Sequence, residues 1–216
     1  MAGTGPIDVW GAVRDERIAL LVDLERLAPA QWEAQSLCTD WRVRDVVAHL
    51  VGAVEAGAAA LFLAMVRSGF NLQRMLGADA RRRSRGLTPG QLLSAYRGTV
   101  GSQRLPPGTR PWQMLSDTMI HGQDIRRALG LRREFPPDRL ATVMDHLVPV
   151  NTILGVRRRI EGLHLRATDM DWTHGDGPDV AGPGEALLMV MTGRPAALAD
   201  VSGEGAAVLQ QRIAPA

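Results

Sequence analysis

The sequence predicts a mainly α-helical protein, in which a four-helix bundle is followed by a small α+β segment. Apolar residues recur at intervals of three and four positions through the larger N-terminal part of the chain, which is typical of amphipathic helices. From Leu163 the period changes to two, which indicates a half-buried strand. With 216 residues, of which 45% are apolar, the chain is long enough to bury a core.

The first two predicted helices are joined by a polar connection. The first extends from about Asp8 to Leu27 and ends before Pro29, since proline cannot continue a helix. The second begins at Val43, carries His49 and runs on to about Val66, because an apolar stripe at helical spacing passes through it.

Residues 68–90 are predicted to form a loop with one short helical turn. This segment contains the RRRSRG run, whose arginines are Arg81, Arg82, Arg83 and Arg85. No aromatic residues alternate with them, as a platform for single-stranded nucleic acid would require. We therefore interpret the run as solvated surface charge.

Two further helices complete the predicted bundle. Thr88 is a suitable N-cap and Pro89 a suitable first residue for the third helix, which extends to about Val100. The fourth follows the segment RLPPGTRPW and ends near Gly130, a residue type common after helix ends. Another helix, from Asp138 to about Ile153, is expected to pack beside the bundle.

The C-terminal part is predicted to be a separate α+β domain, with the boundary between residues 1–155 and 156–216. Leu163 and the residues after it form a strand, and one more strand is expected around Asp171. The segment GPDVAGPGEALLMVMTG supplies a turn and a short apolar helix that ends at Gly193. A last strand or loop and a helix close the chain.

Composition restricts the classes of partner. All 25 basic residues are arginine, yet the formal net charge is only +2, so no strong polyanion partner is implied. No run of 18 apolar residues occurs, and the N-terminus does not resemble a secretory signal. A single cysteine, Cys38, excludes an internal disulfide and suits a reducing compartment. We expect a cytoplasmic protein that binds neither nucleic acid nor membrane.

Asp117, His121 and His49 are the candidate metal ligands. Asp117 and His121 stand four residues apart on a predicted helix, a rotation of about 400°, so both lie on one face. Together with His49 they supply one carboxylate and two imidazoles, which can bind zinc and leave one coordination position open. The alternatives are a packed core histidine at position 49 and a simple carboxylate–imidazole hydrogen bond between the other two.

Two segments resemble a known family. SLCTDWRVRDVVAHLVG and MLSDTMIHGQDIRRALG are similar to the signature segments of the mycothiol-dependent maleylpyruvate isomerase family, which belongs to the DinB-like superfamily of four-helix metalloproteins. LHLRATDMDWTHGDGPDVAGPGEALLMVMTGR resembles the smaller C-terminal domain of that family. The resemblance implies a DinB-like bundle with a metal, usually zinc, at His49, Asp117 and His121. Asp117 stands where the isomerases carry glutamate, which shortens the reach of the carboxylate by one methylene.

The resemblance also implies a chemistry. It predicts a zinc-dependent transferase or isomerase, or one that uses another divalent metal, with mycothiol as the thiol cosubstrate. A metal-bound thiolate would attack a small electrophile. Arg194, in TGRPAAL, matches an arginine that the isomerases use on substrate carboxylates, although it could equally be a helix-capping surface cation. Asp124 is implied to be an active-site residue that orients a ligand imidazole; a salt bridge with Arg127 or Arg97 is the alternative.

Other functions remain open at this point. The protein could be a non-catalytic DinB-like binding or accessory protein, or a metal-dependent hydrolase with Asp124 or Glu55 as its general base. The expected partners are a small-molecule electrophile and a low-molecular-weight thiol, and the expected state is a monomer or homodimer. Trp41 and Trp112 are predicted to pack in the bundle, and Cys38 is predicted to serve apolar packing.

Overall fold

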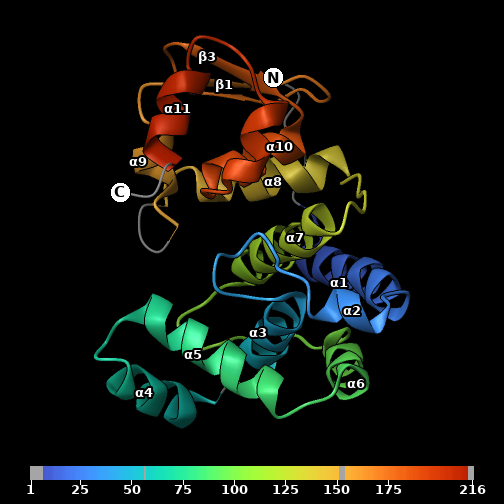
Figure 1. Ribbon diagram of the computed structural model, residues 1–216. Helices are drawn as coiled ribbons and strands as arrows, with labels where there is room; N and C mark the ends of the chain where they lie inside the picture. The colour runs from blue at the N-terminus through green and yellow to red at the C-terminus, as the bar shows by residue number, and fades with distance from the viewer. Residues whose placement is uncertain (1–6, 56, 151–153, 214–216) are drawn as a thin grey trace. The chain divides into compact units, whose positions relative to one another are not determined.

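The computed structural model describes residues 7–55, 57–150 and 154–213. The chain forms two compact units, a helical unit at Asp8–Arg133 and a C-terminal unit that begins at Glu134 (Figure 1). Within the described residues no helix is both long and apolar enough to cross a membrane. The predicted fold class, mainly α with a helical bundle and a small C-terminal α+β part, is confirmed.

Four helices form the bundle of the helical unit. They are α1 (Val9–Glu25), α3 (Val43–Glu55), α6 (Pro89–Thr99) and α7 (Pro111–Ala128). Helix α1 packs against α6 and α7, and α3 packs against the same two helices, so the four close around one core. The core side chains include Leu20, Val47, Leu92, Tyr96 and Ile125. A short helix, α2 (Pro29–Trp32), lies in the connection between α1 and α3.

The predicted helix boundaries in the bundle rest on capping residues. Asp8 caps α1, since its carboxylate accepts a hydrogen bond from the backbone N–H of Gly11 at 3.0 Å. Thr88 caps α6 and shares a capping box with Gln91, and Pro89 is the first helical residue, as predicted. Helix α7 is followed by Gly130, which adopts a left-handed conformation with φ of 68°.

The segment between α3 and α6 differs from the prediction. The helix expected over residues 43–66 is interrupted, since Gly57 is extended and precedes a separate helix, α4 (Ala58–Arg67). Residues 72–85, expected as part of a loop, form α5 (Leu72–Arg85), capped by Asn71. Figure 1 shows α5 lying along α3, with α4 beyond it.

The arginine run explains why α5 was missed. The side chains of Met75, Ala80 and Ser84 are buried and give the helix an inward face. Arginines cover its remaining surface, and the run is partly paired: Arg83 Nε lies 2.8 Å from Asp79 Oδ2, and Arg82 contacts the same carboxylate. The prediction of a loop over these residues was therefore wrong, whereas the exposed side chains of Arg82 and Arg85 agree with the predicted surface charge.

The C-terminal unit combines a three-stranded sheet with helices. Its strands β1 (His164–Ala167), β2 (Thr173–His174) and β3 (Asp179–Gly182) have the order β2-β1-β3, with β1 antiparallel to β2 and parallel to β3. Strands at 164–167 and near Asp171 were expected, but β3 was expected to be a turn. The remaining elements are α8 (Pro137–Leu147), α9 (Val156–Ile160), α10 (Gly184–Met191), η1 (Pro195–Asp200) and α11 (Ala206–Ile213).

Helix α10 forms the centre of this unit. Every side chain from Ala186 to Met191 is fully buried, and α10 contacts β1, β3, α8 and α9. Because α8 packs on α10, the helix expected beside the bundle belongs with the C-terminal unit. The compact units therefore divide at Arg133, ahead of the predicted boundary at residue 155. The predicted end of this helix at Ile153 lies outside the described residues.

Candidate metal centre

Helices α3 and α7 bring the three predicted ligands together. His49 projects from α3, and Asp117 and His121 project from successive turns of α7. Asp117 Oδ1 lies 3.4 Å from His49 Nε2 and 3.5 Å from His121 Nε2. One ligand atom from each of the three residues falls within a mutual distance of 4.8 Å. Residues 68 positions apart in the chain, His49 and Asp117, thus contribute to one compact set of nitrogen and oxygen donors.

The separations suit a bound cation better than direct hydrogen bonds. Zinc binds imidazole nitrogen and carboxylate oxygen at about 2.0–2.1 Å, so neighbouring ligands of a tetrahedral site lie about 3.3–3.4 Å apart. The two separations from Asp117 Oδ1 to the imidazole nitrogens, 3.4 and 3.5 Å, are close to that value. They are longer than the typical N–H···O distance of about 2.9 Å. The side chain of Asp117 is 28% exposed, so the centre is accessible to a ligand from solvent.

The opposite edge of His121 is hydrogen-bonded to Asp124. His121 Nδ1 lies 2.8 Å from Asp124 Oδ2, where the imidazole N–H donates to the carboxylate. Asp124 is fully buried. This arrangement matches the predicted contact between Asp124 and a ligand imidazole. Of the two arginines considered as alternative partners, Arg97 pairs with Glu25 at 2.7 Å.

Two residues near the site were not identified from the sequence. The Cys38 thiol donates to Asp124 Oδ2 at 3.0 Å and lies 3.7 Å from His121 Nδ1, so Cys38 does more than pack against apolar neighbours. The ring of Trp41 lies 4.9 Å from that of His49 and 5.7 Å from that of His121, centroid to centroid. Trp41 also packs against the core, as expected.

The loop before α3 holds both residues in place. Gln35 Nε2 donates to the carbonyl oxygens of Cys38 at 2.7 Å and Trp41 at 2.9 Å. Ser36 Oγ donates to the Trp41 carbonyl at 2.7 Å and accepts from the Cys38 N–H at 3.1 Å. The backbone N–H of Leu37 donates to the Asp124 carbonyl at 3.1 Å, which ties the loop to α7. This loop has no periodic pattern, so spacing alone could not reveal its role.

Asp45 anchors the first turn of α3. It is almost fully buried, and its carboxylate accepts from the Arg42 backbone N–H at 2.9 Å, from Arg42 Nε at 3.1 Å and from Ser84 Oγ. Burial raises the pKa of this carboxyl, but the hydrogen bonds from Ser84 and Arg42 outweigh it, so the pKa lies below its ordinary value. Asp45 thereby joins α3, the helix of His49, to α5.

A buried cation lies in the electrostatic neighbourhood of Asp117. Arg17 is 2% exposed, and its Nη1 donates to the carbonyls of Thr99 at 2.7 Å and Ser102 at 2.8 Å. Burial lowers the pKa of Arg17, and the nearby Tyr96 and Asp117 partly oppose the shift. Burial likewise raises the pKa of the Tyr96 phenol above its ordinary value. The bundle interior thus supplies positive charge near the Asp117 carboxylate.

The remaining predicted residues lie elsewhere. Glu55 is 3.1 Å from Arg83 Nη1 and is not one of the clustered candidate ligands. Arg194 belongs to the C-terminal unit, where its Nη1 donates to the Thr192 carbonyl at 2.8 Å, just after α10. That contact fits the helix-capping alternative. Burial, followed by the charges of Arg194 and Arg158, lowers the pKa of the neighbouring Arg159.

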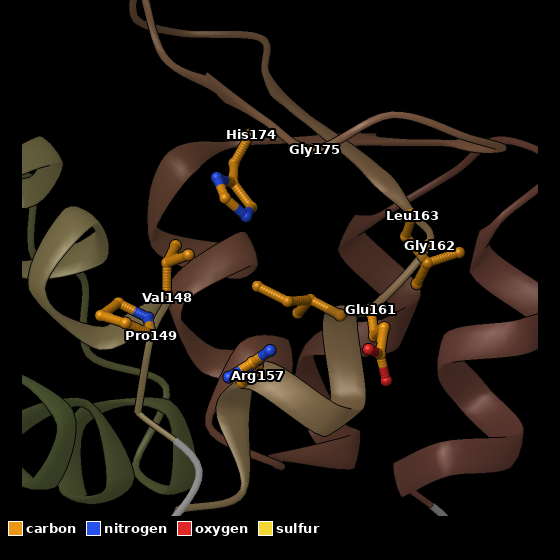
Figure 2. A pocket seen from close by; sticks show the side chains of 9 residues that line it. Val148, Pro149, Arg157, Glu161, Gly162, Leu163, His174 and Gly175 are labelled. Carbon is orange, nitrogen blue, oxygen red and sulfur yellow. The ribbon is translucent and has the colours of Figure 1, made fainter.

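The C-terminal unit also contains a cavity of about 310 Å³ (Figure 2). It lies between the end of α8, helix α9 and the turn after β2. Val148, Pro149, Ile160 and Leu163 give it a mainly apolar lining. None of the predicted site residues lines it.

Comparisons with known proteins show a similarity between part of the helical unit and one protein family. Residues 13–105 match the family model described as the mycothiol maleylpyruvate isomerase N-terminal domain. A comparison with curated proteins gave no match. Among solved structures, the mycothiol-dependent maleylpyruvate isomerase and a histidine-to-alanine mutant of it each align with a TM-score of 0.62 and 15% identity, over 92% of both chains. At this identity the structural likeness establishes the fold.

Proposed function

We propose that this chain is a zinc-dependent enzyme that uses mycothiol, since residues 13–105 match the family model described as the mycothiol maleylpyruvate isomerase N-terminal domain. It would act as a transferase or isomerase on a small electrophilic substrate. The observation that carries the proposal is the spacing of the three ligand atoms. Asp117 Oδ1 lies 3.4 Å from Nε2 of His49 and 3.5 Å from Nε2 of His121. That spacing agrees with neighbouring ligands of one tetrahedral ion.

The proposed ligands are His49 Nε2, the Asp117 carboxylate and His121 Nε2. When bound there, zinc would supply Lewis acidity that lowers the pKa of a thiol and favours the thiolate at neutral pH. Asp124 accepts a hydrogen bond from Nδ1–H of His121, which leaves the Nε2 lone pair free to bind the ion. Asp117 is the most exposed of the three ligands, so substrate and thiol are expected to enter on its side.

The chain's own residues suit addition of sulfur to an electrophilic carbon. In an isomerase the sulfur–carbon bond forms, the former double bond rotates, and the thiol leaves, so no oxidant or reductant is needed. In a transferase the sulfur–carbon bond persists in the product. The Trp41 ring beside both imidazoles shields that side of the centre from water. For Arg194 we propose a contact with a substrate carboxylate, which its planar guanidinium could bind through two hydrogen bonds.

The first experiment is the metal content of the purified protein by plasma mass spectrometry. We expect about one zinc per chain in the wild type, since three protein ligands form one site. His121→Ala should lose it while keeping a folded helical spectrum. The matched control is His146→Ala, which replaces an exposed histidine of α8 and should retain the zinc. Absence of metal in the wild type after incubation with zinc would contradict the proposal.

The second experiment measures turnover. Mycothiol with maleylpyruvate, and mycothiol with a set of other small electrophiles, should react faster with the zinc-loaded wild type than with His121→Ala. Zinc binding without any turnover would favour an accessory protein, and turnover independent of the thiol would favour a hydrolase. A cytoplasmic location and a monomeric or homodimeric state belong to the same proposal, and gel filtration with light scattering tests the latter.

A further inference from the structure

Cys38, Asp124 and His121 form a continuous chain of contacts behind the proposed metal site. The Cys38 thiol donates to Asp124 Oδ2 at 3.0 Å, and His121 Nδ1 lies 2.8 Å from the same oxygen. The two donors are 3.7 Å apart. One carboxylate oxygen therefore accepts hydrogen bonds from a thiol in the loop before α3 and from an imidazole of α7.

Distances separate this chain of contacts from the metal ligands. Neighbouring ligands of a tetrahedral zinc lie about 3.3–3.4 Å apart, whereas Nδ1 and Oδ2 are 2.8 Å apart, which is a hydrogen-bond length. Cys38 lies at the Nδ1 edge of the imidazole, opposite the Nε2 edge that faces Asp117. The thiol can therefore influence the proposed metal site through Asp124 and His121, although it is not itself a ligand of the metal.

Asp124 gives the thiol its importance. The side chain is fully buried, so each hydrogen bond to its carboxylate replaces solvation by water, and loss of the Cys38 donor would weaken that replacement. The loop fixes the donor, since Gln35 and Ser36 hold the Cys38 carbonyl and N–H. The position of the Cys38 side chain is therefore fixed by the loop. Its hydrogen bond to Asp124 limits the rotation of the carboxylate that contacts His121.

We propose that Cys38 is a positioning residue, whose thiol holds Asp124 so that His121 keeps its proton on Nδ1 and presents Nε2 to the metal. This inference rests on the proposed ligand set. It differs from a packing role because it requires a hydrogen-bond donor at position 38, and not only a small apolar side chain.

Two substitutions distinguish donation from packing. Cys38→Ser keeps a donor, and Cys38→Ala removes it with little change in volume. We expect the zinc dissociation constant, measured by chelator competition, to rise about tenfold in Cys38→Ala, the lower end of the effect of outer-shell partners. Cys38→Ser should stay within about threefold of the wild type, and the cobalt-substituted visible spectrum should shift only in Cys38→Ala. Thr39→Ala, in the same loop but exposed, is the control.

Three outcomes would overturn the inference. Unchanged zinc affinity in Cys38→Ala would leave only packing, and equal losses in both variants would show that the thiol's size matters and not its donor. A thiolate-to-cobalt charge-transfer band in the wild type, absent from both variants, would make Cys38 a ligand.

The ¹⁵N shifts of His121 in metal-free protein test the relay separately from the proposed function. They should show the Nδ1–H tautomer in the wild type and Cys38→Ser, and a mixture in Cys38→Ala. This result would hold even for a protein that bound no zinc, whereas the same tautomer in all three proteins would overturn the relay.

Discussion

The two edges of the His121 imidazole lie in different surroundings. On the Nε2 side, Asp117 Oδ1 is 3.5 Å away and its side chain is 28% exposed. On the Nδ1 side, Asp124 Oδ2 is 2.8 Å away and fully buried. The outer edge therefore has room for a cation between donors, while a proton already occupies the gap at the inner edge. The His121 side chain is thus held by a buried carboxylate at Nδ1, while its Nε2 faces the partly exposed side where a metal could bind.

This difference separates binding from stability. The Asp117 side chain on the outer edge is 28% exposed, so we expect its replacement to cost metal affinity more than stability. Groups on the inner edge are buried and hydrogen-bonded, so their loss should cost both metal affinity and free energy of unfolding. The variants below compare the two edges, beginning with the largest expected effect.

Asp117→Asn should abolish binding at the outer edge. We expect the zinc affinity to fall by more than about 100-fold, beyond the usual effect of outer-shell partners, because a carboxylate ligand is lost. The free energy of unfolding of metal-free protein should change by about 1 kcal/mol or less, since the site is partly solvated. Calorimetric titration and urea unfolding measure the two quantities. Asp117→Glu, which keeps the carboxylate on a longer side chain, should retain zinc; equal loss in both variants would argue against ligation by this carboxylate.

Asp124→Asn should damage the inner edge in both respects. Zinc affinity should fall about 10- to 100-fold, as for other outer-shell partners of a ligand histidine. The metal-free protein should also lose about 1–3 kcal/mol of stability, because the donors of His121 and Cys38 would no longer face the buried carboxylate. Urea unfolding at pH 7 provides the comparison with Asp117→Asn. If both variants unfolded with the same free energy, the distinction between the two edges would fail.

The sequence predicted the outer edge better than the inner one. The four-residue spacing of Asp117 and His121 places them on one helical face, and this follows from helix geometry alone. His49 was named as a candidate ligand by its residue type and supported by the family resemblance, but spacing could not predict its contact with Asp117, which joins two distant helices. Cys38 and Trp41 were not assigned to the site, since their placement depends on hydrogen bonds within an aperiodic loop.

The fold shows the same limit. The bundle helices were predicted from apolar stripes and capping residues, which are local signals. Helix α5 was missed because arginines surround a narrow buried face, and β3 because four residues that pair with β1 give no local period. The amphipathic pattern of α8 predicted a helix but not its partner. Pairing between distant segments is the part of the structure that one sequence does not specify by pattern.

Asp45→Asn tests the anchor of α3, the helix that carries the proposed ligand His49. The pKa of Asp45 is lowered in the folded protein, so its contribution is present above the unfolded pKa of about 3.9 and is lost as pH falls below it. We expect a loss of about 1–2 kcal/mol at pH 7 and a shrinking difference from the wild type between pH 5 and pH 3. Asp40→Asn, at an exposed residue of the preceding loop, should have no such profile. A constant difference across this range would contradict the assigned pKa shift.

Tyr96→Phe should have the smallest effect and the opposite sign. The hydroxyl is buried and makes no hydrogen bond within the described residues, so its removal should stabilise the fold by about 1 kcal/mol or less. Zinc affinity should not change, since Tyr96 is not a proposed ligand and its only described interaction with Asp117 is electrostatic. The raised pKa of the phenol means that wild-type stability falls as pH rises above about 10, where the unfolded tyrosine ionises, and the variant should lack that contribution. Loss of stability or of zinc in Tyr96→Phe would show that the hydroxyl supports the outer edge. A core residue would then affect metal binding at that edge, and binding and stability would not be separable there.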